Sequence, residues 1–167
     1  MVFKKIYILL LLIGLTSCRY SFTGASVPPH LKTIAITTFI DRSGSGEPDL
    51  SNKFTNQLIQ KFINDNTLQV TDKSNSDCLI EGTITSLSDA PAVISGNETI
   101  TTQRITINVR VIYKDLVKRQ TIFERDFSNY TDYKIDASNI INLRKTAIDE
   151  TIDKITEDIL LGVVSNW

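Results

Sequence analysis

Alternating apolar and polar positions define the middle of the chain. In the segment RITINVRVIYKD every second residue is apolar, namely Ile105, Ile107, Val109, Val111 and Tyr113. This period of two predicts a β-strand with one buried face and one solvated face. The segment DCLIEGTITSLS alternates in the same way, and KRQTIFERDFSNY follows after a short turn near residues 115–118. We therefore expect the last two segments to form an antiparallel hairpin in a larger sheet.

Two other segments repeat their apolar residues at helical spacing. In residues 50–64 large apolar side chains recur every four positions, at Leu50, Phe54, Leu58 and Phe62. In residues 138–164 one narrow stripe of a helical projection holds Ile141, Ile148, Ile152, Ile155, Ile159 and Val163. Both patterns predict amphipathic helices. Because each helix has one apolar side, we expect both to cover the same face of the sheet.

The order of these elements predicts the fold class. The short segments KTIAITTF and LQVTD are rich in β-branched residues and supply two further strands, which gives the order β-α-β-β-β-β-α. We predict an α+β fold: a single mixed, mainly antiparallel sheet of about four to five strands with two helices packed on one face. Residues 32–167 are enough for one domain with its own core.

The first 17 residues have the three parts of a secretory signal peptide. Lys4 and Lys5 provide a positive start, Ile6–Leu15 is almost wholly apolar, and Thr16 and Ser17 are small. A helix of about ten residues rises only about 15 Å, whereas a bilayer core is about 30 Å thick. The segment therefore suits an export channel and is too short to span a membrane.

The tetrapeptide at residues 15–18, Leu-Thr-Ser-Cys, resembles a bacterial lipobox. The resemblance implies that Cys18 receives a thioether-linked diacylglycerol, becomes the first residue of the mature chain and is acylated on its amine. Two or more acyl chains anchor a protein stably to a membrane. The alternative is an ordinary signal peptide with a chance cysteine. Residues 18–31 then form a tether that Pro28 and Pro29 stiffen. Arg19 follows the cysteine where an inner-membrane retention signal would have Asp, so we expect the periplasmic side of the outer membrane.

Charge and chemistry narrow the function further. The chain has 18 Lys and Arg against 19 Asp and Glu, and loss of Lys4 and Lys5 makes the remainder more acidic, which argues against nucleic-acid binding. His30 is the only histidine, whereas catalytic triads and common zinc sites need more. We expect no enzyme activity, no metal and no cofactor. With Cys18 acylated, Cys78 has no partner for a disulfide, and its place in a strand pattern indicates a buried thiol.

Six basic side chains cluster on the predicted hairpin: Arg104, Arg110, Lys114, Lys118, Arg119 and Arg125. One interpretation is a solvated face, since charge runs usually face water. The other is a contact with a phosphorylated, anionic glycolipid, because Arg and Lys bind phosphate well.

The whole mature chain resembles the LptE family of lipopolysaccharide-assembly lipoproteins, in the form found in Bacteroidetes-type bacteria. The resemblance rests on CRYSFTGASVPPHLKTIAITTF, LIEGTITSLSDAPAVISGNETITTQRITINVRVIY, DFSNYTDY and the terminal VVSNW. It implies a non-enzymatic outer-membrane lipoprotein that partners an LptD-type β-barrel and helps lipopolysaccharide to reach the outer leaflet. The loop 89–103 would lie at one end of the domain, and we expect that end, with the basic hairpin, to meet the barrel or the glycolipid.

Two other classes stay open. The segments IAITTFIDRSGSG and DCLIEGTIT also resemble the opening of penicillin-binding-protein activators and curli-secretion lipoproteins, where a strand ends in Phe-x-Asn/Asp-x-Ser-Gly and a later strand carries Glu-Gly. A secreted hydrolase is a third class, for which the sequence offers no pair of nucleophile and base.

The predicted tether generates a direct test. The mature protein should carry acyl chains on Cys18, which mass spectrometry of the N-terminal peptide would detect. A Cys18→Ala protein should lose the lipid, leave the membrane fraction and keep the circular dichroism spectrum of a folded domain. An unacylated N-terminus in the native protein would contradict the prediction.

Overall fold

The computed structural model describes residues 27–92, 102–136 and 138–165. The expected signal peptide 1–17, the lipidation residue Cys18 and most of the expected tether lie outside the described residues, as does the centre of the loop 89–103. The last part of that tether, from Val27, lies against the domain, and Leu31 is 4% exposed in its core.

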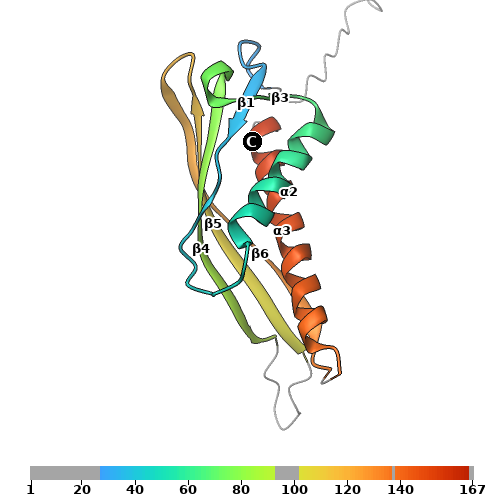
Figure 1. The fold of residues 1–167 in the computed structure, drawn as a ribbon. Helices are drawn as coiled ribbons and strands as arrows, with labels where there is room; N and C mark the ends of the chain where they lie inside the picture. Colours follow the sequence, from blue (N-terminus) through green and yellow to red (C-terminus); the bar gives the residue numbers. More distant parts are fainter. Residues whose placement is uncertain (1–26, 93–101, 137, 166–167) are drawn as a thin grey trace, which may run out of the picture.

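Within the described residues the chain forms six strands and two α-helices (Figure 1). The short strands are β1 (Thr33–Ile36), β2 (Ile40–Asp41) and β3 (Gln69–Val70). The long strands are β4 (Cys78–Pro91), β5 (Thr102–Asp115) and β6 (Gln120–Lys134). The helices are α2 (Leu50–Asp65) and α3 (Ile140–Val164), and a 3-10 turn covers Lys73–Asn75.

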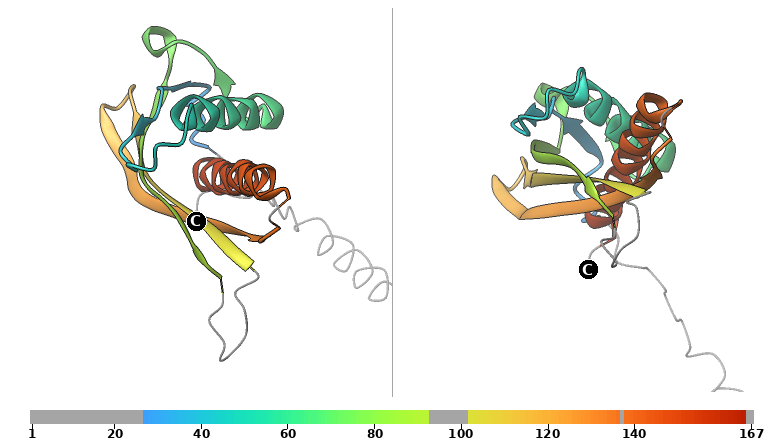
Figure 2. Two further views of the ribbon diagram at one scale, coloured as in Figure 1. Left: turned by 60° about the horizontal axis from the view of Figure 1, so that its bottom comes forward. Right: turned by 90° about the horizontal axis from the view of Figure 1, so that it is seen from below.

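These strands form one mixed sheet in the order β3-β1-β4-β5-β6, and β2 pairs with β4. The short strands pair in parallel, whereas the long strands β4, β5 and β6 form an antiparallel meander. Both helices lie on one side of the sheet, as Figure 2 shows. The predicted α+β class, the mainly antiparallel sheet and the placement of the two helices are confirmed.

The predicted apolar positions build the core between the helices and the sheet. In α2 the four residues spaced by four, Leu50, Phe54, Leu58 and Phe62, are each at most 1% exposed. The predicted stripe of α3 is also buried, except that Ile141 is 81% exposed. Ile141 lies in the first turn of α3, at the end of the sheet, where no described element covers it. The prediction for Ile141 is therefore wrong.

A change of register in β4 alters which residues face the helices. Ile80, Gly82 and Ile84 lie on the helix side, as the alternation predicts, and pair with the buried face of β5. Between Ile84 and Ser86 the pairing shifts at a β-bulge. Because a one-residue insertion exchanges the two faces, Asp89 then pairs with Ile105 and faces the helix side. The bulge thus brings a carboxylate to the helix side of the sheet.

A close contact between Phe39 and Gly82 joins the N-terminal segment to the sheet. Strand β1 ends at Ile36, and the Phe39 ring is 1% exposed, at 4.9 Å between ring centroids from Phe54 of α2. The Phe39 N–H donates to the Thr55 hydroxyl at 3.0 Å. A Cβ atom on Gly82 would lie 2.0 Å from Phe39 Cε1, so only glycine leaves room for the ring.

The substitution Gly82→Ala should destabilise the domain by about 3 kcal/mol, because the added methyl forces the Phe39 ring out of its site. Urea unfolding of the purified variant would measure this cost. Ser88→Ala, at an exposed site on the same strand, should change the free energy of unfolding by less than about 0.5 kcal/mol.

Coupling between the two positions tests the cause. In a Phe39→Leu background, Gly82→Ala should cost clearly less than in the native chain, because contacting residues are not additive. Equal costs in the two backgrounds would contradict the proposed clash.

Candidate functional site

Among the described elements, α2 and α3 both lie on one face of β4, β5 and β6, so neither helix covers the outer face of these strands (Figure 2). Register places the buried series Ile105 to Tyr113 toward the helices, so the alternate residues of β5 point outward. Outward positions on the three strands are mostly small and polar: Ser86, Ser88, Thr106, Asn108 and Ser128. This surface, which we call the open face, has the character of a solvated or contact face.

Cross-strand ion pairs also lie on the open face. Arg104 makes two hydrogen bonds to Asp132, of 2.6 and 2.8 Å, and its guanidinium lies 3.9 Å from the centroid of the Tyr130 ring. Arg110 makes two hydrogen bonds to Asp126, of 2.8 and 3.1 Å. These hydrogen bonds hold the pKa of both carboxyl groups below their ordinary value. Two of the predicted basic residues are therefore neutralised by strand β6.

Lys114 is paired as well. Its ammonium group contacts the Glu81 carboxylate on β4, which Lys73 also approaches at 3.4 Å. The hydrogen bond from Lys114 is the main cause that lowers the pKa of Glu81. The open face thus presents alternating charges, and it is not a uniformly basic patch.

The sequence contains the signal for this pairing, although sequence reasoning missed the carboxylates Glu81, Asp126 and Asp132. Arg104 and Arg110 are separated along β5 by the same interval as Asp126 and Asp132 along β6. In an antiparallel hairpin such equal spacing brings both pairs together at once. Consideration of acidic and basic positions together would have predicted these pairs.

The remaining three predicted cations lie elsewhere on the hairpin. Lys118 and Arg119 are in the turn between β5 and β6, where Arg119 has a left-handed backbone with φ of 55°. Arg125 pairs with Val111, on the helix side of the sheet. The turn and the loop 89–103 lie at opposite ends of the 14-residue strand β5. The six cations therefore do not form one surface, and only Arg104 lies near the loop.

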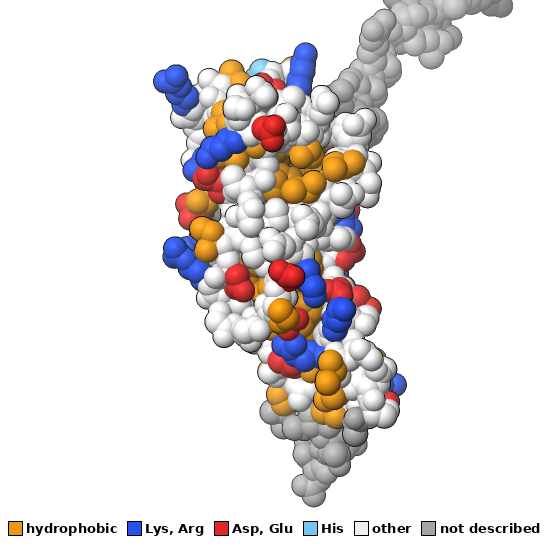
Figure 3. Space-filling model, in the orientation of Figure 1, with side chains coloured by type: hydrophobic (Ala, Val, Ile, Leu, Met, Phe, Trp, Pro, Cys, Tyr) orange, Lys and Arg blue, Asp and Glu red, His pale blue; other side chains and the backbone are white. Residues whose placement is uncertain are grey.

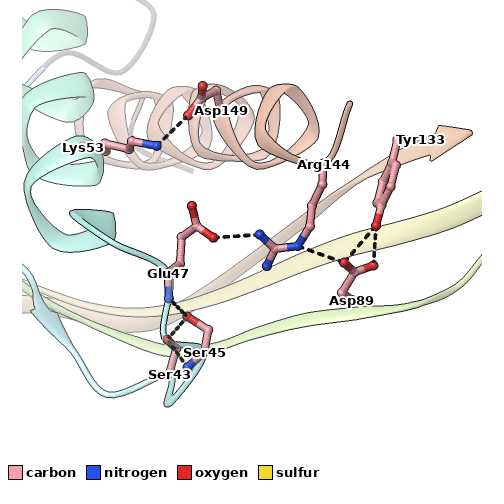
Figure 4. Close-up of polar contacts among 8 residues, drawn as sticks. All are labelled: Ser43, Ser45, Glu47, Lys53, Asp89, Tyr133, Arg144 and Asp149. Atoms are coloured by element: carbon pink, nitrogen blue, oxygen red, sulfur yellow. Dashed lines mark hydrogen bonds and ion pairs between the residues drawn. The ribbon is translucent and has the colours of Figure 1, made fainter. Parts of the chain in front are cut away.

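A polar network closes the loop end of the helix layer (Figure 4). Arg144 of α3 donates to Glu47, which precedes α2, at 2.7 Å, and to Asp89 of β4 at 3.1 Å. The Tyr133 hydroxyl of β6 bonds to the same Asp89 carboxylate at 2.8 Å. Burial and this hydrogen bond raise the pKa of Tyr133 to about 12, so the hydroxyl stays a donor. The network holds four segments in fixed relative positions.

Apolar side chains are exposed beside this network. Ile135 is 39% exposed, Ile140 is 37% exposed and Ile141 is 81% exposed. Figure 3 shows apolar side chains gathered at the lower end of the molecule. Clustered exposure of large apolar residues is typical of an interaction surface.

The candidates for catalytic chemistry have structural roles. Burial raises the pKa of the Cys78 thiol to about 11, and its Sγ donates to the Thr33 carbonyl at 3.3 Å, so it is not a nucleophile near neutral pH. His30 Nε2 is hydrogen-bonded to Asp115 Oδ2 at 2.7 Å. In the described ranges no group of His, Cys, Asp or Glu is placed to hold a metal ion. The helices described here include none long and apolar enough to cross a bilayer.

A helix-covered sheet with an ion-paired open face defines a small α+β interaction domain. A family model described as "LptE: Lipopolysaccharide-assembly" matches residues 31–161, which is most of the chain. The chain belongs to this family, whose members are non-enzymatic assembly lipoproteins. No curated protein matches the chain by sequence.

Solved structures share the fold at low sequence identity. A hypothetical protein from Chlamydia trachomatis has a TM-score of 0.59 at 9% identity, covering 80% of this chain and 95% of that chain. Rare lipoprotein B from Shewanella oneidensis has a TM-score of 0.55 at 11% identity, covering 78% and 92%. A minor lipoprotein from Acinetobacter baumannii has a TM-score of 0.52 at 14% identity, covering 81% and 92%. At these identities the likeness shows the fold alone.

The Arg144 network predicts a stability difference between two arginines. Arg144→Met should lower the free energy of unfolding by about 1 to 2 kcal/mol, because Glu47, only 11% exposed, loses its partner. The matched variant Arg110→Met breaks a solvent-exposed pair and should have a much smaller effect. Urea unfolding of both variants measures the difference. A Glu47→Gln background should reduce the cost of Arg144→Met; an unchanged cost would contradict the network.

Proposed function

We propose that this chain is an outer-membrane lipoprotein that partners an LptD-type β-barrel in the assembly and transport of lipopolysaccharide to the outer leaflet. The observation that carries the proposal is the family match over residues 31–161. Two of the solved structures named above are also lipoproteins by name. The lipobox-like Cys18 agrees with an assembly lipoprotein.

The proposed anchor limits where the domain acts. The nine residues from Cys18 to Ser26 span at most about 30 Å when extended. An acylated Cys18 therefore keeps the domain beside the inner surface of the outer membrane, where the periplasmic opening of a barrel would lie. The domain can then contact the barrel without crossing the membrane itself.

The open face is the proposed contact surface for the barrel. Its outward side chains are mostly hydrogen-bonding groups and paired ions, which suit a reversible, wet interface rather than a dry apolar one. The Arg104–Asp132 and Arg110–Asp126 pairs present both charge signs at fixed positions. Such a pattern favours a partner with matching charges and disfavours others. In this proposal Arg104, Arg110 and Lys114 of the open face contribute orientation more than bulk attraction.

An alternative is a periplasmic regulator or a secretion lipoprotein resembling penicillin-binding-protein activators or curli-secretion lipoproteins. The sequence features behind that resemblance are Phe39 and the Glu81-Gly82 pair, and Phe39 packs directly on Gly82. A packing requirement of this α+β fold accounts for both features without a shared partner. The assembly role is therefore favoured.

Affinity purification of the tagged lipoprotein from detergent-solubilised outer membranes tests the proposal. The native chain should recover an LptD-type barrel, which mass spectrometry would identify. Thr106→Arg places an unpaired charge in the open face and should reduce recovery of the barrel at least about tenfold.

Gln60→Arg is the matched control, because it adds the same charge on the exposed side of α2. This variant should recover the barrel as well as the native chain does. Recovery of a peptidoglycan synthase without any barrel would favour the alternative function. Equal recovery with Thr106→Arg and the native chain would exclude the open face as the interface.

A further inference from the structure

A cleft of about 350 Å³ opens at the turn end of the sheet. It lies between the segment that begins at Val27, the turn joining β5 to β6, and the last turn of α3. Val27, Phe123 and Val163 contribute apolar walls, and Lys118 and Arg125 contribute basic groups. Figure 3 shows Lys and Arg side chains projecting from this upper end of the molecule.

The basic groups here differ from those of the open face. Within the described residues Lys118, Arg119 and Arg125 form no ion pair, whereas Arg104, Arg110 and Lys114 all do. The lining includes one carboxylate, that of Asp115, which is only 2% exposed. It is already hydrogen-bonded to His30 at 2.7 Å and to the Lys118 N–H at 2.8 Å. The three cations are therefore available to an external anion.

Exposed apolar side chains accompany these cations. Val117, at the turn, is 57% exposed, and Ile122, on the lining of the cleft, is 40% exposed. The Arg125 guanidinium lies 5.2 Å from the centroid of the Phe123 ring, which keeps it at the edge of the apolar wall. Apolar side chains flanked by Lys and Arg are typical of surfaces that rest on anionic lipid, because the cations meet phosphate while the apolar groups reach the acyl boundary.

The chain direction places this end toward the membrane if Cys18 is the anchor, and to that extent the inference rests on the proposed function. Val27 lines the cleft itself, so the described part of the chain begins here, only nine residues after Cys18. The opposite end lies a further 14 residues along β5, which is about 45 Å at the rise of a β-strand. The turn end is therefore the end that the anchor holds nearest to the bilayer.

An interaction of these cations with the C-terminus of α3 would explain only some of the features of the turn end. The C-terminus of α3 carries a partial negative charge, and Gly162 and Val163 line the same cleft, so Arg125 or Lys118 can complement the helix end. That role does not involve Arg119 in the turn, and it gives no reason for the exposure of Val117.

We propose that the turn end, comprising Val117, Lys118, Arg119, Ile122 and Arg125, is a membrane-docking tip that binds anionic glycerophospholipid. A lipid phosphate lies between Lys118 and Arg125, and Val117 and Ile122 enter the interface between headgroups and acyl chains. The acyl anchor keeps the domain near the bilayer, and the tip then fixes its orientation.

A fluorescence depth measurement on the acylated full-length chain tests the tip. Val117→Trp in a Trp167→Phe background reports on the tip, and Ile141→Trp in the same background is the matched probe at the opposite end, since Ile141 is 81% exposed. Each protein is reconstituted into phosphatidylcholine vesicles with brominated acyl chains, with and without phosphatidylglycerol. Bromine quenches only a tryptophan that enters the bilayer.

We expect strong quenching of the Val117→Trp probe with phosphatidylglycerol, loss of that quenching at high salt, and none for the Ile141→Trp probe. Lys118→Gln with Arg119→Gln should remove most of the quenching, and added Arg125→Gln should reduce it to the level of the Ile141→Trp probe. Lys134→Gln with Lys145→Gln, a matched pair away from the tip, should leave it unchanged. Thermal melts establish that each variant is folded.

Two outcomes would overturn the docking tip: no quenching of the Val117→Trp probe, or quenching that ignores both lipid charge and the basic residues. A drop in melting temperature on Arg125→Gln with unchanged quenching would assign that residue to the end of α3. Recovery of the barrel by the same variants separates the two proposals. A quenching-negative chain that still recovers the barrel leaves the proposed function standing.

Discussion

Burial of one face of the β4–β5–β6 sheet under α2 and α3 is the constraint on which the other features depend. The helices bury one side of β5 completely: Ile105, Ile107, Val109 and Val111 are each 0% exposed. Because side chains alternate along a strand, the residues between them face away from the helices. These outward residues are covered by neither α2 nor α3, so their polar groups form hydrogen bonds with water or with one another. The cross-strand pairs of arginine and aspartate are the result, and they hold positive and negative groups at fixed positions on the open face.

The contact between Phe39 and Gly82 shows why sequence similarity can point to several lipoprotein classes at once. The Phe39 ring occupies the space that a Cβ atom on Gly82 would need. The Ser51 hydroxyl donates to the Phe39 carbonyl, and the Phe39 N–H donates to the Thr55 hydroxyl, both in the first half of α2. A strand ending near Phe, a helix, and a strand with Gly are then parts of one packing unit. Chains with unrelated partners can share that unit, so the family assignment gains from the match over residues 31–161.

Periodicity predicted the elements well, because the buried positions of α2, α3 and β5 follow their ideal spacing closely. It failed where the chain departs from ideal geometry. The bulge after Ile84 turns Asp89 toward the helices, and the end of the sheet leaves Ile141 uncovered. The candidate surfaces were harder to predict, since the six basic residues were considered without their acidic partners. Only the strand register distinguishes the paired Arg110 from Lys118, which has no ion pair in the described residues.

Strand β6 ends the sheet, and among the described elements nothing pairs with its outer backbone edge. The unpaired backbone groups of this 15-residue edge strand could form hydrogen bonds with a strand of a second molecule, which is a route to aggregation. Glu124, Asp126 and Asp132 all point to the open face of this strand, so two copies of β6 side by side in parallel register would confront carboxylates with carboxylates. The acidic partners of the arginines therefore also discourage self-association into fibres.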